Sequence, residues 1–450
     1  MNRQRTILTG QEMRTAEEQA AENGISEWVL MQQAGRGAGQ AMAASANGLP
    51  ILVLCGTGNN GGDGYVAAET LRRMGCDVRV AAFDQPDREP AKTAANYWNG
   101  ETISPESADP CAVFVDALFG TGLSRPLEGV AHAALLRLAA GSQQRIAFDL
   151  PSGVDSDTGR CLSSTPEFHR TLAFGALKPS HLLYPAAQFC GRVDVVPIDI
   201  DASKARTFAL AAPERINIDP TAHKYQRGSV AVAAGDMPGA AGLAARAAQR
   251  AGAGFVTLAG NTSPFPPSSL VMREVIDLDA RRTDAGVIGP GLGSGETAEA
   301  LAAAFLSLGV PLVIDGDMFS IFADKPDQLF GRGDVMTPHE GEFGRFFGDL
   351  SGSKIDRART AAARSGNVIV LKGADTVIAS PAGDVAVNDH AHPRLAVAGS
   401  GDILAGIIAA EIARGRSPFD AACAGVWRHG DGGLKARDGM IAEDLLELIR

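Results

Sequence analysis

Two glycine-rich strings hold the residues best suited to chemistry in this chain. One reads Cys-Gly-Thr-Gly-Asn-Asn-Gly-Gly-Asp-Gly over Cys55–Gly64, and the other reads Ala-Gly-Ser-Gly-Asp-Ile-Leu-Ala-Gly over Ala398–Gly406. Glycine lets the backbone come close to a ligand, and a helix start offers N–H groups to an anion. Each string also carries one carboxylate, Asp63 or Asp402. The chain is therefore predicted to handle a phosphate-bearing metabolite at two places.

The second string has the plainer mechanism. Gly399–Gly401 are expected to present N–H groups at the start of a helix over Asp402–Arg414, as an anion hole for a transferring phosphoryl group. Asp402 then lies beside that group, where it can accept a hydroxyl proton. Lys372 and Thr376 flank a turn between two predicted strands and are suited to meet nucleotide phosphates. The alternatives are that Asp402 is only a favourable charge at a helix start and that Lys372 is a surface side chain.

The first string is one of three loops that each follow a predicted strand. The other two loops span Asp116–Pro126 and Asp149–Gly159. In an open parallel sheet, ligands bind beyond the carboxyl ends of the strands, so the polar residues of these loops are expected to converge. Asn60, Asp116 and Ser152 offer oxygen ligands without His or Cys, which suits a monovalent cation better than zinc. A plain glycine turn, with capping by the aspartates, is the alternative.

The elements that position these residues follow from the pattern of apolar runs. In the first half, strands are expected at Ile51–Leu54, Val78–Phe83, Ala112–Leu118, Arg145–Leu150, Thr171–Leu177 and Val193–Ile198. Helices are expected at Gln11–Glu22, Ser26–Ala44, Tyr65–Met74 and Val130–Ala140. Continuously apolar strands separated by helices indicate a parallel sheet that is covered on both faces.

The rhythm stops at Asp201–Ala222, which carries Pro213 and Pro220 and is predicted to be a linker. Beyond it, strands are expected at Ser229–Ala234, Phe255–Ala259, Val287–Ile288, Leu312–Ile314, Asn367–Leu371 and Thr376–Ala379. Helices are expected at Ala240–Ala251, Glu296–Leu308, Lys354–Ser365, Asp402–Arg414 and Phe419–Lys435. Because no repeat relates the halves, we expect two different α/β domains, residues 1–205 and 223–450, joined by a linker over 206–222.

Composition narrows the classes of partner. The net charge of −11 and the lack of a basic cluster argue against nucleic acid as the main ligand. The six cysteines lack metal-type spacing and are expected to be free thiols in a reducing compartment. The first ten residues are too poor in apolar side chains for a signal peptide, and there is no run of about 18 apolar residues. We therefore expect a soluble cytoplasmic protein without a membrane span.

The first half resembles the NAD(P)H-hydrate epimerase family over most of residues 10–200. The resemblance lies in Met13–Glu18, Leu30–Gly35, the Asn-Asn-Gly-Gly-Asp-Gly string, Asp116–Gly122 and Asp149–Asp155. It implies a potassium ion held by Asn60, Asp116 and Ser152, with Asp149 as the candidate acid or base and Lys178 as a weaker one that is otherwise an exposed charge. It implies hydrate contacts at Asn59, Asn60, Gly61, Gly62, Asp63, Gly120, Thr121, Gly122, Leu123, Ser124, Arg125, Pro126 and Asp149.

The second half resembles the ribokinase-like superfamily and, more narrowly, the ADP-dependent NAD(P)H-hydrate dehydratases. The resemblance spans most of residues 223–435 and lies in His223–Ser229, Pro238–Ala241, Gly289–Gly293, Thr337–Phe343, Leu371–Ile378 and the Gly-Ser-Gly-Asp string. It implies ADP as co-substrate, with Mg²⁺, at Lys372, Gly373, Ala374, Asp375, Thr376, Gly399, Ser400 and Gly401. It implies hydrate contacts at Ala240, Gly291, Gly293, His339 and Asp402, where His339 is otherwise a helix-capping residue.

Two departures from that family pattern stand out. Gly316 and Met318 replace two alanines, and Asn388–Arg394 replaces an Asn-Thr-Gly stretch before the catalytic loop. The second departure falls on the nucleotide side of the predicted site.

Together the resemblances imply a bifunctional enzyme that repairs hydrated nicotinamide dinucleotides. The expected fold is an N-terminal Rossmann-like three-layer α/β/α domain followed by a ribokinase-like α/β domain, and we expect small-molecule substrates only, no nucleic acid or membrane partner, and a homo-oligomer. The alternatives are a small-molecule kinase fused to a regulatory ligand-binding domain, and a first half that is a non-enzymatic binding module. The presence of Asn60, Asp116, Asp149 and Ser152 favours an enzyme, because a scaffold needs no cation site.

Overall fold

The chain folds into two compact units. The structure, a computed structural model, describes residues 5–46, 48–217, 219–260, 269–275 and 278–449. One unit comprises residues 5–205 and the other runs from residue 206 to the C-terminal end of the chain. Among the helices of the described residues, none combines the length and apolar character needed to cross a membrane.

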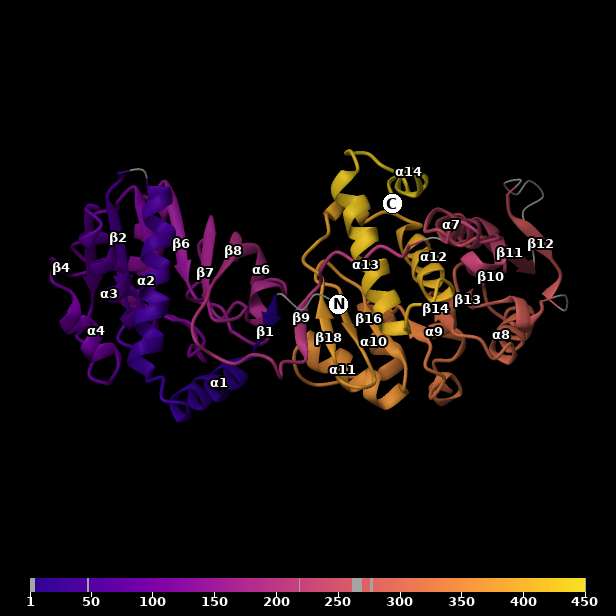
Figure 1. The fold of residues 1–450 in the computed structure, drawn as a ribbon, viewed down its shortest axis with the longest axis horizontal. Coiled ribbons are helices and arrows are strands. Elements are labelled where there is room, and N and C mark those ends of the chain that lie inside the picture. The colour runs from indigo at the N-terminus through magenta and orange to yellow at the C-terminus, as the bar shows by residue number, and fades with distance from the viewer. Residues whose placement is uncertain (1–4, 47, 218, 261–268, 276–277, 450) are drawn as a thin grey trace. The chain divides into compact units, whose positions relative to one another are not determined.

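The first unit is built on a parallel sheet in the order β4-β3-β2-β5-β6-β7-β8 (Figure 1). Its strands are β2 (Ile51–Cys55), β3 (Val78–Ala82), β4 (Thr102–Ile103), β5 (Val113–Ala117), β6 (Gln144–Phe148), β7 (Arg170–Phe174) and β8 (Arg192–Val196). The short strand β1 (Thr6–Ile7) is held by backbone hydrogen bonds to Leu177. The strand order turns back between β2 and β5, which is where ligands bind in open α/β sheets.

Helices cover both faces of this sheet, as the apolar strands predict. They are α1 (Gly10–Glu22), α2 (Glu27–Ala46), α3 (Asn59–Arg73), α4 (Ala91–Tyr97), α5 (Gly129–Ala140) and α6 (Ala187–Cys190). One buried cluster joins α2 and α3 to the sheet through residues such as Met42 and Val66, and a second joins α5 to the other face through Leu135 and Phe114. The expected three-layer α/β/α arrangement is therefore confirmed.

The glycine-rich string near residue 60 differs from the expectation. It was predicted to be a loop before a helix over Tyr65–Met74, but α3 already begins at Asn59, with Gly58 as its N-cap. The glycines serve close packing in the first helical turn: a Cβ atom on Gly61 would lie 1.9 Å from the oxygen of Gly56, and one on Gly62 would lie 2.6 Å from the Met31 side chain. The string thus lets the helix start pack directly against the sheet end and α2.

The second unit holds a larger sheet in the order β9-β18-β17-β16-β15-β14-β13-β10-β11-β12. Its strands are β9 (Thr207–Ala209), β10 (Ser229–Ala234), β11 (Phe255–Gly260), β12 (Val271–Arg273), β13 (Ala285–Ile288), β14 (Leu312–Ile314), β15 (Val335–Met336), β16 (Val368–Leu371), β17 (Val377–Ala379) and β18 (Val385–Val387). The strands pair in parallel except where β17 pairs antiparallel with β16 and β18.

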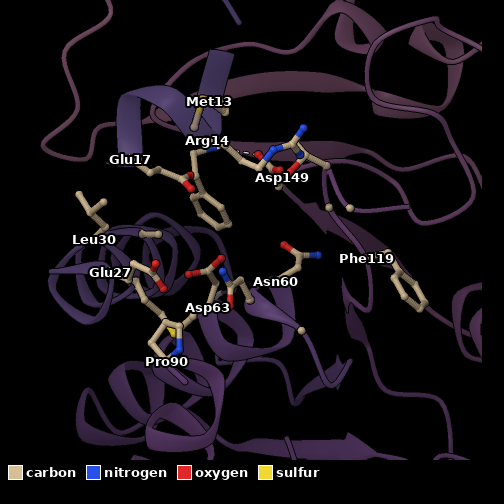
Figure 2. A pocket seen from close by; sticks show the side chains of 18 of the residues that line it. Met13, Arg14, Glu17, Glu27, Leu30, Asn60, Asp63, Pro90, Phe119 and Asp149 are labelled. Carbon is tan, nitrogen blue, oxygen red and sulfur yellow. Dashed lines mark hydrogen bonds between the residues drawn. The ribbon is translucent and has the colours of Figure 1, made fainter. Parts of the chain in front are cut away.

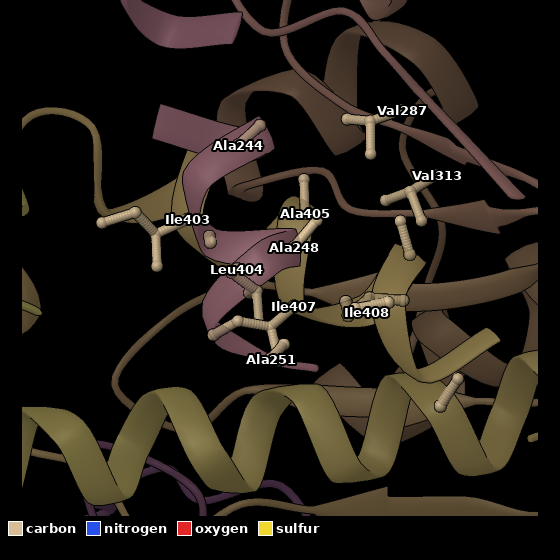
Figure 3. Close-up of a cluster of buried hydrophobic side chains, with 14 of the residues drawn as sticks. Ala244, Ala248, Ala251, Val287, Val313, Ile403, Leu404, Ala405, Ile407 and Ile408 are labelled. Carbon is tan, nitrogen blue, oxygen red and sulfur yellow. The ribbon is translucent and has the colours of Figure 1, made fainter. Parts of the chain in front are cut away.

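The helices of this unit are α7 (Pro238–Arg250), α8 (Glu296–Ser307), α9 (Asp317–Ile321), α10 (Glu340–Phe347), α11 (Lys354–Ser365), α12 (Ser400–Ala413), α13 (Pro418–Lys435) and α14 (Ala442–Leu448). Helix α12 is the centre of the core. Its Ile403, Ile407 and Ile408 lie among alanines of α7 and valines of the sheet (Figure 3). Burying one such isoleucine contributes about 1.5–3 kcal/mol.

Close contact between α12 and α7 depends on a glycine. A Cβ atom on Gly406 would lie 2.1 Å from the backbone oxygen of Ala244, so only glycine permits this approach. The start of α12 is consequently fixed relative to the sheet by the body of the helix.

Part of the predicted linker belongs to the second unit. Residues 207–209 form β9, which pairs in parallel with β18, and Phe208 is buried with its ring edge-on to that of Phe419. The prediction of a linker from residue 206 is wrong for these residues, because a strand of three residues is too short to be recognised by its periodicity. The same reason explains why β12, β15 and β18 were not predicted.

Candidate functional site

The first unit contains a cavity of about 470 Å³ at the carboxyl ends of its central strands (Figure 2). Residues that follow β2, β5 and β6 meet side chains of α1 and α2 there. The predicted site residues that line it are Asn59, Asn60, Asp63, Gly120, Thr121, Gly122 and Asp149. Three loops that are far apart in the sequence thus converge, as expected from their positions at strand ends.

Other predicted contacts do not reach this cavity. Of the described residues, those predicted but absent from its walls are Gly61, Gly62, Leu123, Ser124, Arg125 and Pro126. Gly61 and Gly62 face the backbone of Gly56 and the side chain of Met31, and the residues from Ser124 to Pro126 are exposed.

Asp149 occupies an unusual backbone conformation at this cavity. Its φ is 58°, the one positive φ among described residues other than glycine. This conformation costs on the order of 1–3 kcal/mol and persists only where neighbours support it. Its N–H donates to Leu172 O at 2.8 Å, and His181 Nε2 donates to its carbonyl oxygen at 2.6 Å. The backbone at Asp149 is thus held from both sides.

The protonation of His181 follows from its contacts. Its Nδ1 accepts the backbone N–H of Lys178 at 2.8 Å, which leaves the proton of the neutral ring on Nε2. Burial, followed by the charge of Lys178, lowers the pKa of His181 to about 4. The ring is therefore neutral near pH 7 and acts as a fixed donor to Asp149.

Lys178 is buried and forms an ion pair with the carboxylate of Asp149. Its Nζ donates to Asp149 Oδ1, to Phe174 O at 2.8 Å and to Ala176 O at 3.2 Å. The side chain is only 1% exposed, so the alternative of an exposed charge is wrong for this residue. The three ammonium hydrogens are used within the protein, which ties the Asp149 carboxylate to one position.

Three more acidic residues line the cavity, Asp63 from α3, Glu17 from α1 and Glu27 from α2 (Figure 2). Burial raises the pKa of Asp63 well above its ordinary value, and the charges of Asp149 and Glu17 raise it further. Burial also raises the pKa of Glu17. Asp63 was predicted as a substrate contact, whereas Glu17 was missed as a site residue.

The predicted cation ligands differ in their hydrogen bonds. Asn60 is buried, and neither polar atom of its side-chain amide has a hydrogen-bond partner among the described residues. Asp116 and Ser152 bond to one another: Asp116 accepts Ser152 Oγ at 2.7 Å, Ser152 N at 2.8 Å and Leu118 N at 3.1 Å. In the described part of the chain no three His, Cys, Asp or Glu side chains are grouped to bind a metal.

The second candidate site lies at the start of α12. Lys372, directly after β16, donates from Nζ to Asp315 Oδ1, directly after β14, at 2.7 Å. A Cβ atom on Gly401 would lie 3.5 Å from Lys372 Nζ and 3.8 Å from Asp315 Oδ2, so this ion pair borders the first turn of the helix. Burial, followed by the charge of Asp315, raises the pKa of Asp402 to about 6. The structure therefore brings together Lys372, Gly401 and Asp402, as predicted.

The loop after β13 carries Gly291 and Gly293, which were predicted to contact the hydrate. Gly291 has a positive φ of 59°, and a Cβ atom there would lie 2.5 Å from Met237 O and 3.0 Å from Ala240 Cβ. Gly291 and Ala240 are thus neighbours. Gly293 donates from its N–H to Asp317 Oδ2 at 2.8 Å.

His339 acts as the N-cap of α10. Its Nδ1 accepts the N–H groups of Gly341 at 3.0 Å and Glu342 at 3.2 Å, and Glu342 Oε2 accepts the N–H of His339 at 2.8 Å. The capping alternative is therefore correct for Nδ1, while Nε2 lies 3.6 Å from Glu342 Oε1.

Several residues predicted to bind the nucleotide also have structural bonds. Thr376 Oγ1 bonds to both backbone groups of Gly373 and closes the turn between β16 and β17. Asp375 accepts Lys354 Nζ at 2.6 Å. Ser400 Oγ lies 2.9 Å from Nε2 of the partly buried His429. The turn and the start of α12 are accordingly held by hydrogen bonds within the protein.

Asp315 was missed by the sequence analysis, although a signal for it existed. It follows the predicted strand Leu312–Ile314, the same position at a strand end that singled out Asp116 and Asp149. Glu17 had no comparable signal, because it lies in a helix among other charged residues.

Comparisons with known proteins agree for both units. Residues 27–180 match the family model described as YjeF-related protein N-terminus, and residues 230–449 match the model described as NAD(P)H-hydrate dehydratase. The chain is 33% identical to a bifunctional NAD(P)H-hydrate repair enzyme Nnr of Thermofilum pendens, covering 97% of this chain and 94% of that protein. It is 33% identical to the protein of the same name from Escherichia coli, covering 99% and 93%.

A solved structure of an ADP/ATP-dependent NAD(P)H-hydrate dehydratase from Bacillus subtilis, co-crystallized with ATP and Mg²⁺, is 30% identical to the part it matches. The match covers 53% of this chain and 91% of that chain, with a TM-score of 0.45.

Proposed function

The chain belongs to the family of bifunctional NAD(P)H-hydrate repair enzymes, and on this premise we propose that residues 5–205 interconvert the R and S hydrates of NADH and NADPH, and that residues 206–450 dehydrate the S hydrate at the expense of ADP. The observation that carries the proposal is a lysine–aspartate ion pair at the candidate site of each unit, Lys178–Asp149 in the first and Lys372–Asp315 in the second. The Asp149–Lys178 cavity serves the first activity, and the start of α12 with Asp402 serves the second.

Dehydration needs a better leaving group than hydroxide. The proposed route transfers the β-phosphoryl group of ADP to the hydroxyl of the hydrate, with Asp402 as the base that accepts the hydroxyl proton. The ring nitrogen's lone pair then expels phosphate and forms an iminium ion, and loss of a proton from the neighbouring ring carbon to water gives the intact reduced cofactor. The other products are AMP and phosphate. The N–H groups at the start of α12 and the ammonium of Lys372 stabilise the negative charge on the transferring group.

The conformation of the chain supports this assignment. Gly399 is the N-cap of α12 with a positive φ of 87°, so the first N–H groups of the helix point out of its end. Mg²⁺ is proposed to accompany the nucleotide, where it would neutralise charge on the phosphates.

Epimerisation requires a proton to be moved near the hydroxyl-bearing ring carbon. Asp149 is proposed as the acid or base, because it lies at the cavity with its carboxylate fixed by Lys178 and its backbone fixed by His181. An attached epimerase makes both hydrates repairable, since the dehydration acts on one configuration only.

Potassium is proposed for the first site on the strength of Asn60. A buried amide oxygen without a described partner suits a weakly held monovalent cation. Asp116 already accepts three hydrogen bonds, so it and Ser152 would add oxygens only through their remaining lone pairs. When bound, the ion would supply a positive charge beside the loops. Thermal unfolding titrated with KCl tests this: the midpoint should rise for the wild type, with choline chloride as control, and stay constant for Asn60→Ala.

The alternative of a kinase fused to a regulatory domain is not favoured, because relatives that match nearly the whole chain carry the bifunctional repair name. A homo-oligomeric state and a cytoplasmic location stay predictions.

One assay tests the proposed function as a whole. A mixture of both NADH hydrates is incubated with ADP, Mg²⁺ and KCl, and recovery of NADH is followed by its absorbance. Full recovery supports both activities. Recovery of the S fraction alone would rule out the proposed epimerase activity. Recovery that does not depend on a nucleotide would rule out the proposed ADP-dependent dehydratase activity.

A further inference from the structure

Asp63 is a buried carboxyl group that the proposed function leaves without a specific role. It lies in the first turn of α3, is 9% exposed, and lines the 470 Å³ cavity. Among the described residues, no hydrogen bond or ion pair involves its carboxyl group. This position favours a bound proton or a ligand, because burying an unpaired charge is unfavourable.

A second buried polar group on the same helix face strengthens this point. Asn60 precedes Asp63 by three residues, so the two side chains are neighbours on the helix, and the amide of Asn60 also lacks a described partner. Two adjacent polar side chains, each about nine-tenths buried and each turned to the cavity, indicate that this face of α3 was shaped for a ligand (Figure 2).

The surroundings of Asp63 differ from those of Asp149. The ammonium of Lys178 is bonded to Asp149 and to two backbone oxygens. It therefore acts on Asp63 only through longer-range electrostatic attraction, without a direct hydrogen bond. The titratable or charged groups that face Asp63 are Asp149 after β6, Glu17 of α1, Lys178 after β7 and Cys55 of β2, with Glu27 and Arg14 on the same cavity wall. Burial and the two nearby carboxylates raise the pKa of Asp63, which favours the form that carries a proton.

The two aspartates also enter the cavity from different walls, Asp63 from α3 and Asp149 from the end of β6 (Figure 2). Epimerisation moves a hydroxyl from one face of a ring carbon to the other, so it needs a proton donor on one side and an acceptor on the other. We propose that Asp63 is a catalytic residue of the epimerase, the proton donor that acts opposite Asp149 and across the ring from it.

The step balances as follows for R-to-S conversion. Asp63 gives its proton to the ring hydroxyl, the bond between that oxygen and the ring carbon breaks, and water leaves. The lone pair of the ring nitrogen forms the C=N bond of an iminium. A solvent water then adds to the opposite face, its oxygen bonds to the carbon, its proton passes to Asp149, and the C=N electron pair returns to nitrogen. Exchange with water restores both carboxyl groups, and S-to-R conversion uses the same groups in exchanged roles.

This inference rests on the proposed function, so the experiment separates the two. ADP is omitted, which silences the dehydratase, and conversion of purified R hydrate to S hydrate by the full chain is followed by chromatography, after subtraction of the rate without enzyme. If the wild type does not convert it, the proposed function fails. If the wild type converts it, Asp63→Asn tests the inference.

We expect Asp63→Asn to lower kcat by about 10²–10⁴-fold, with a smaller change in KM, because an amide keeps the shape but has no acidic proton. Glu18→Gln is the control, an exposed carboxyl group of α1 that does not line the cavity, and should change kcat less than about threefold. If Asp63→Asn fails to fold, as judged by thermal unfolding, Asp63→Ala serves instead, and formate should restore part of its activity. A variant that keeps its kcat, or an Ala variant that formate does not restore, would overturn the inference.

An isotope experiment tests the bond that breaks. In water enriched in ¹⁸O, the wild type should place ¹⁸O in the hydroxyl of the S hydrate at the rate of conversion, because the original oxygen leaves. Conversion without incorporation would overturn the proposed step.

Discussion

Each unit places a lysine–aspartate ion pair beside a third titratable group, a carboxyl group that has no partner among the described residues. In the first unit the pair is Lys178–Asp149 and the third group is Asp63, while in the second the pair is Lys372–Asp315 and the third group is Asp402. Burial differs between the two third groups. Asp63 is deeply buried, and Asp402 is partly exposed at the end of a helix.

This difference decides which way a proton moves. The pKa of Asp402 is raised only to about 6, so the group is mostly ionised near pH 7 and suits a base. The pKa of Asp63 is raised well above its ordinary value by burial, so this group suits a proton donor. The comparison teaches that similar charged groups can serve opposite chemistry when the depth of burial changes.

The largest expected effect is the loss of the base in the second unit. Asp402→Asn should lower dehydration of the S hydrate by about 10²–10⁴-fold in kcat, since the hydroxyl proton then has no acceptor. Interconversion of the hydrates should be unchanged, because Asp149 and Lys178 lie in the other unit. ADP-dependent formation of NADH measures the first and chromatography without ADP the second. Dehydration near the normal rate would show that Asp402 is not the base.

The matching change in the first unit is Asp149→Asn. It should lower R-to-S conversion by up to about 10²–10⁴-fold, although the spontaneous reaction limits the effect that can be observed. A mixture of hydrates given ADP should then yield NADH only from its S fraction in the fast phase. Repair of the whole mixture at the wild-type rate contradicts the assignment of Asp149, and the Asp402→Asn protein serves as the reciprocal control.

The pH dependence of dehydration tests the role of Asp402 at the second site. The pKa of Asp402 is raised to about 6, so the carboxylate that accepts the proton is present above that pH and is lost as pH falls through it. At pH 5 about one-tenth remains ionised, and kcat/KM for dehydration, which reports the free enzyme, should fall about tenfold from its plateau. The profile is measured with ADP and S hydrate well below saturation. A plateau that continues to pH 5 would show that another group is the base.

The smallest expected effect concerns the nucleotide. The N–H groups at the start of α12 and the turn at Lys372–Thr376 should place the β-phosphoryl group of ADP beside Asp402, and the γ-phosphoryl group of ATP would be crowded there. We expect kcat/KM to be about tenfold lower with ATP, equivalent to about 1.4 kcal/mol. Equal or higher efficiency with ATP defeats this prediction, and the atypical stretch Asn388–Arg394 is where its cause should be sought first.

Much of the fold could be predicted because its strands are buried runs of apolar residues with helices between them. The bounds of β10 and of α11 were both predicted correctly. Strand β10 is an unbroken apolar run after Ser229, and the N-cap Ser353 marks the start of α11. The start of α3 could not be predicted, because five glycines within a string argue for a loop unless the packing against Gly56 and Met31 is known.

The candidate sites were predicted in part for a related reason. Asp149 and Lys372 were found because they follow strands, and a strand end is visible in the sequence. The partner of Lys372 was not found: Asp315 lies 57 residues from it, and no local pattern links the two. The positive φ of Asp149 and the burial of Lys178 likewise depend on tertiary contacts with Leu172 and His181.

The contact between Gly406 and Ala244 has a consequence for how this enzyme can vary. Gly406 lies about 7.5 Å along α12 from Gly401, so the helix that carries the anion hole is the same rigid body that fills the core. An added methyl group at this contact would push the helix away from α7 and carry the anion hole with it. A substitution there would therefore lower catalytic activity, although the altered atom lies in the hydrophobic interior. Sequence changes in the core contact of α12 and in its active-site turn are thus limited by the same position of the helix.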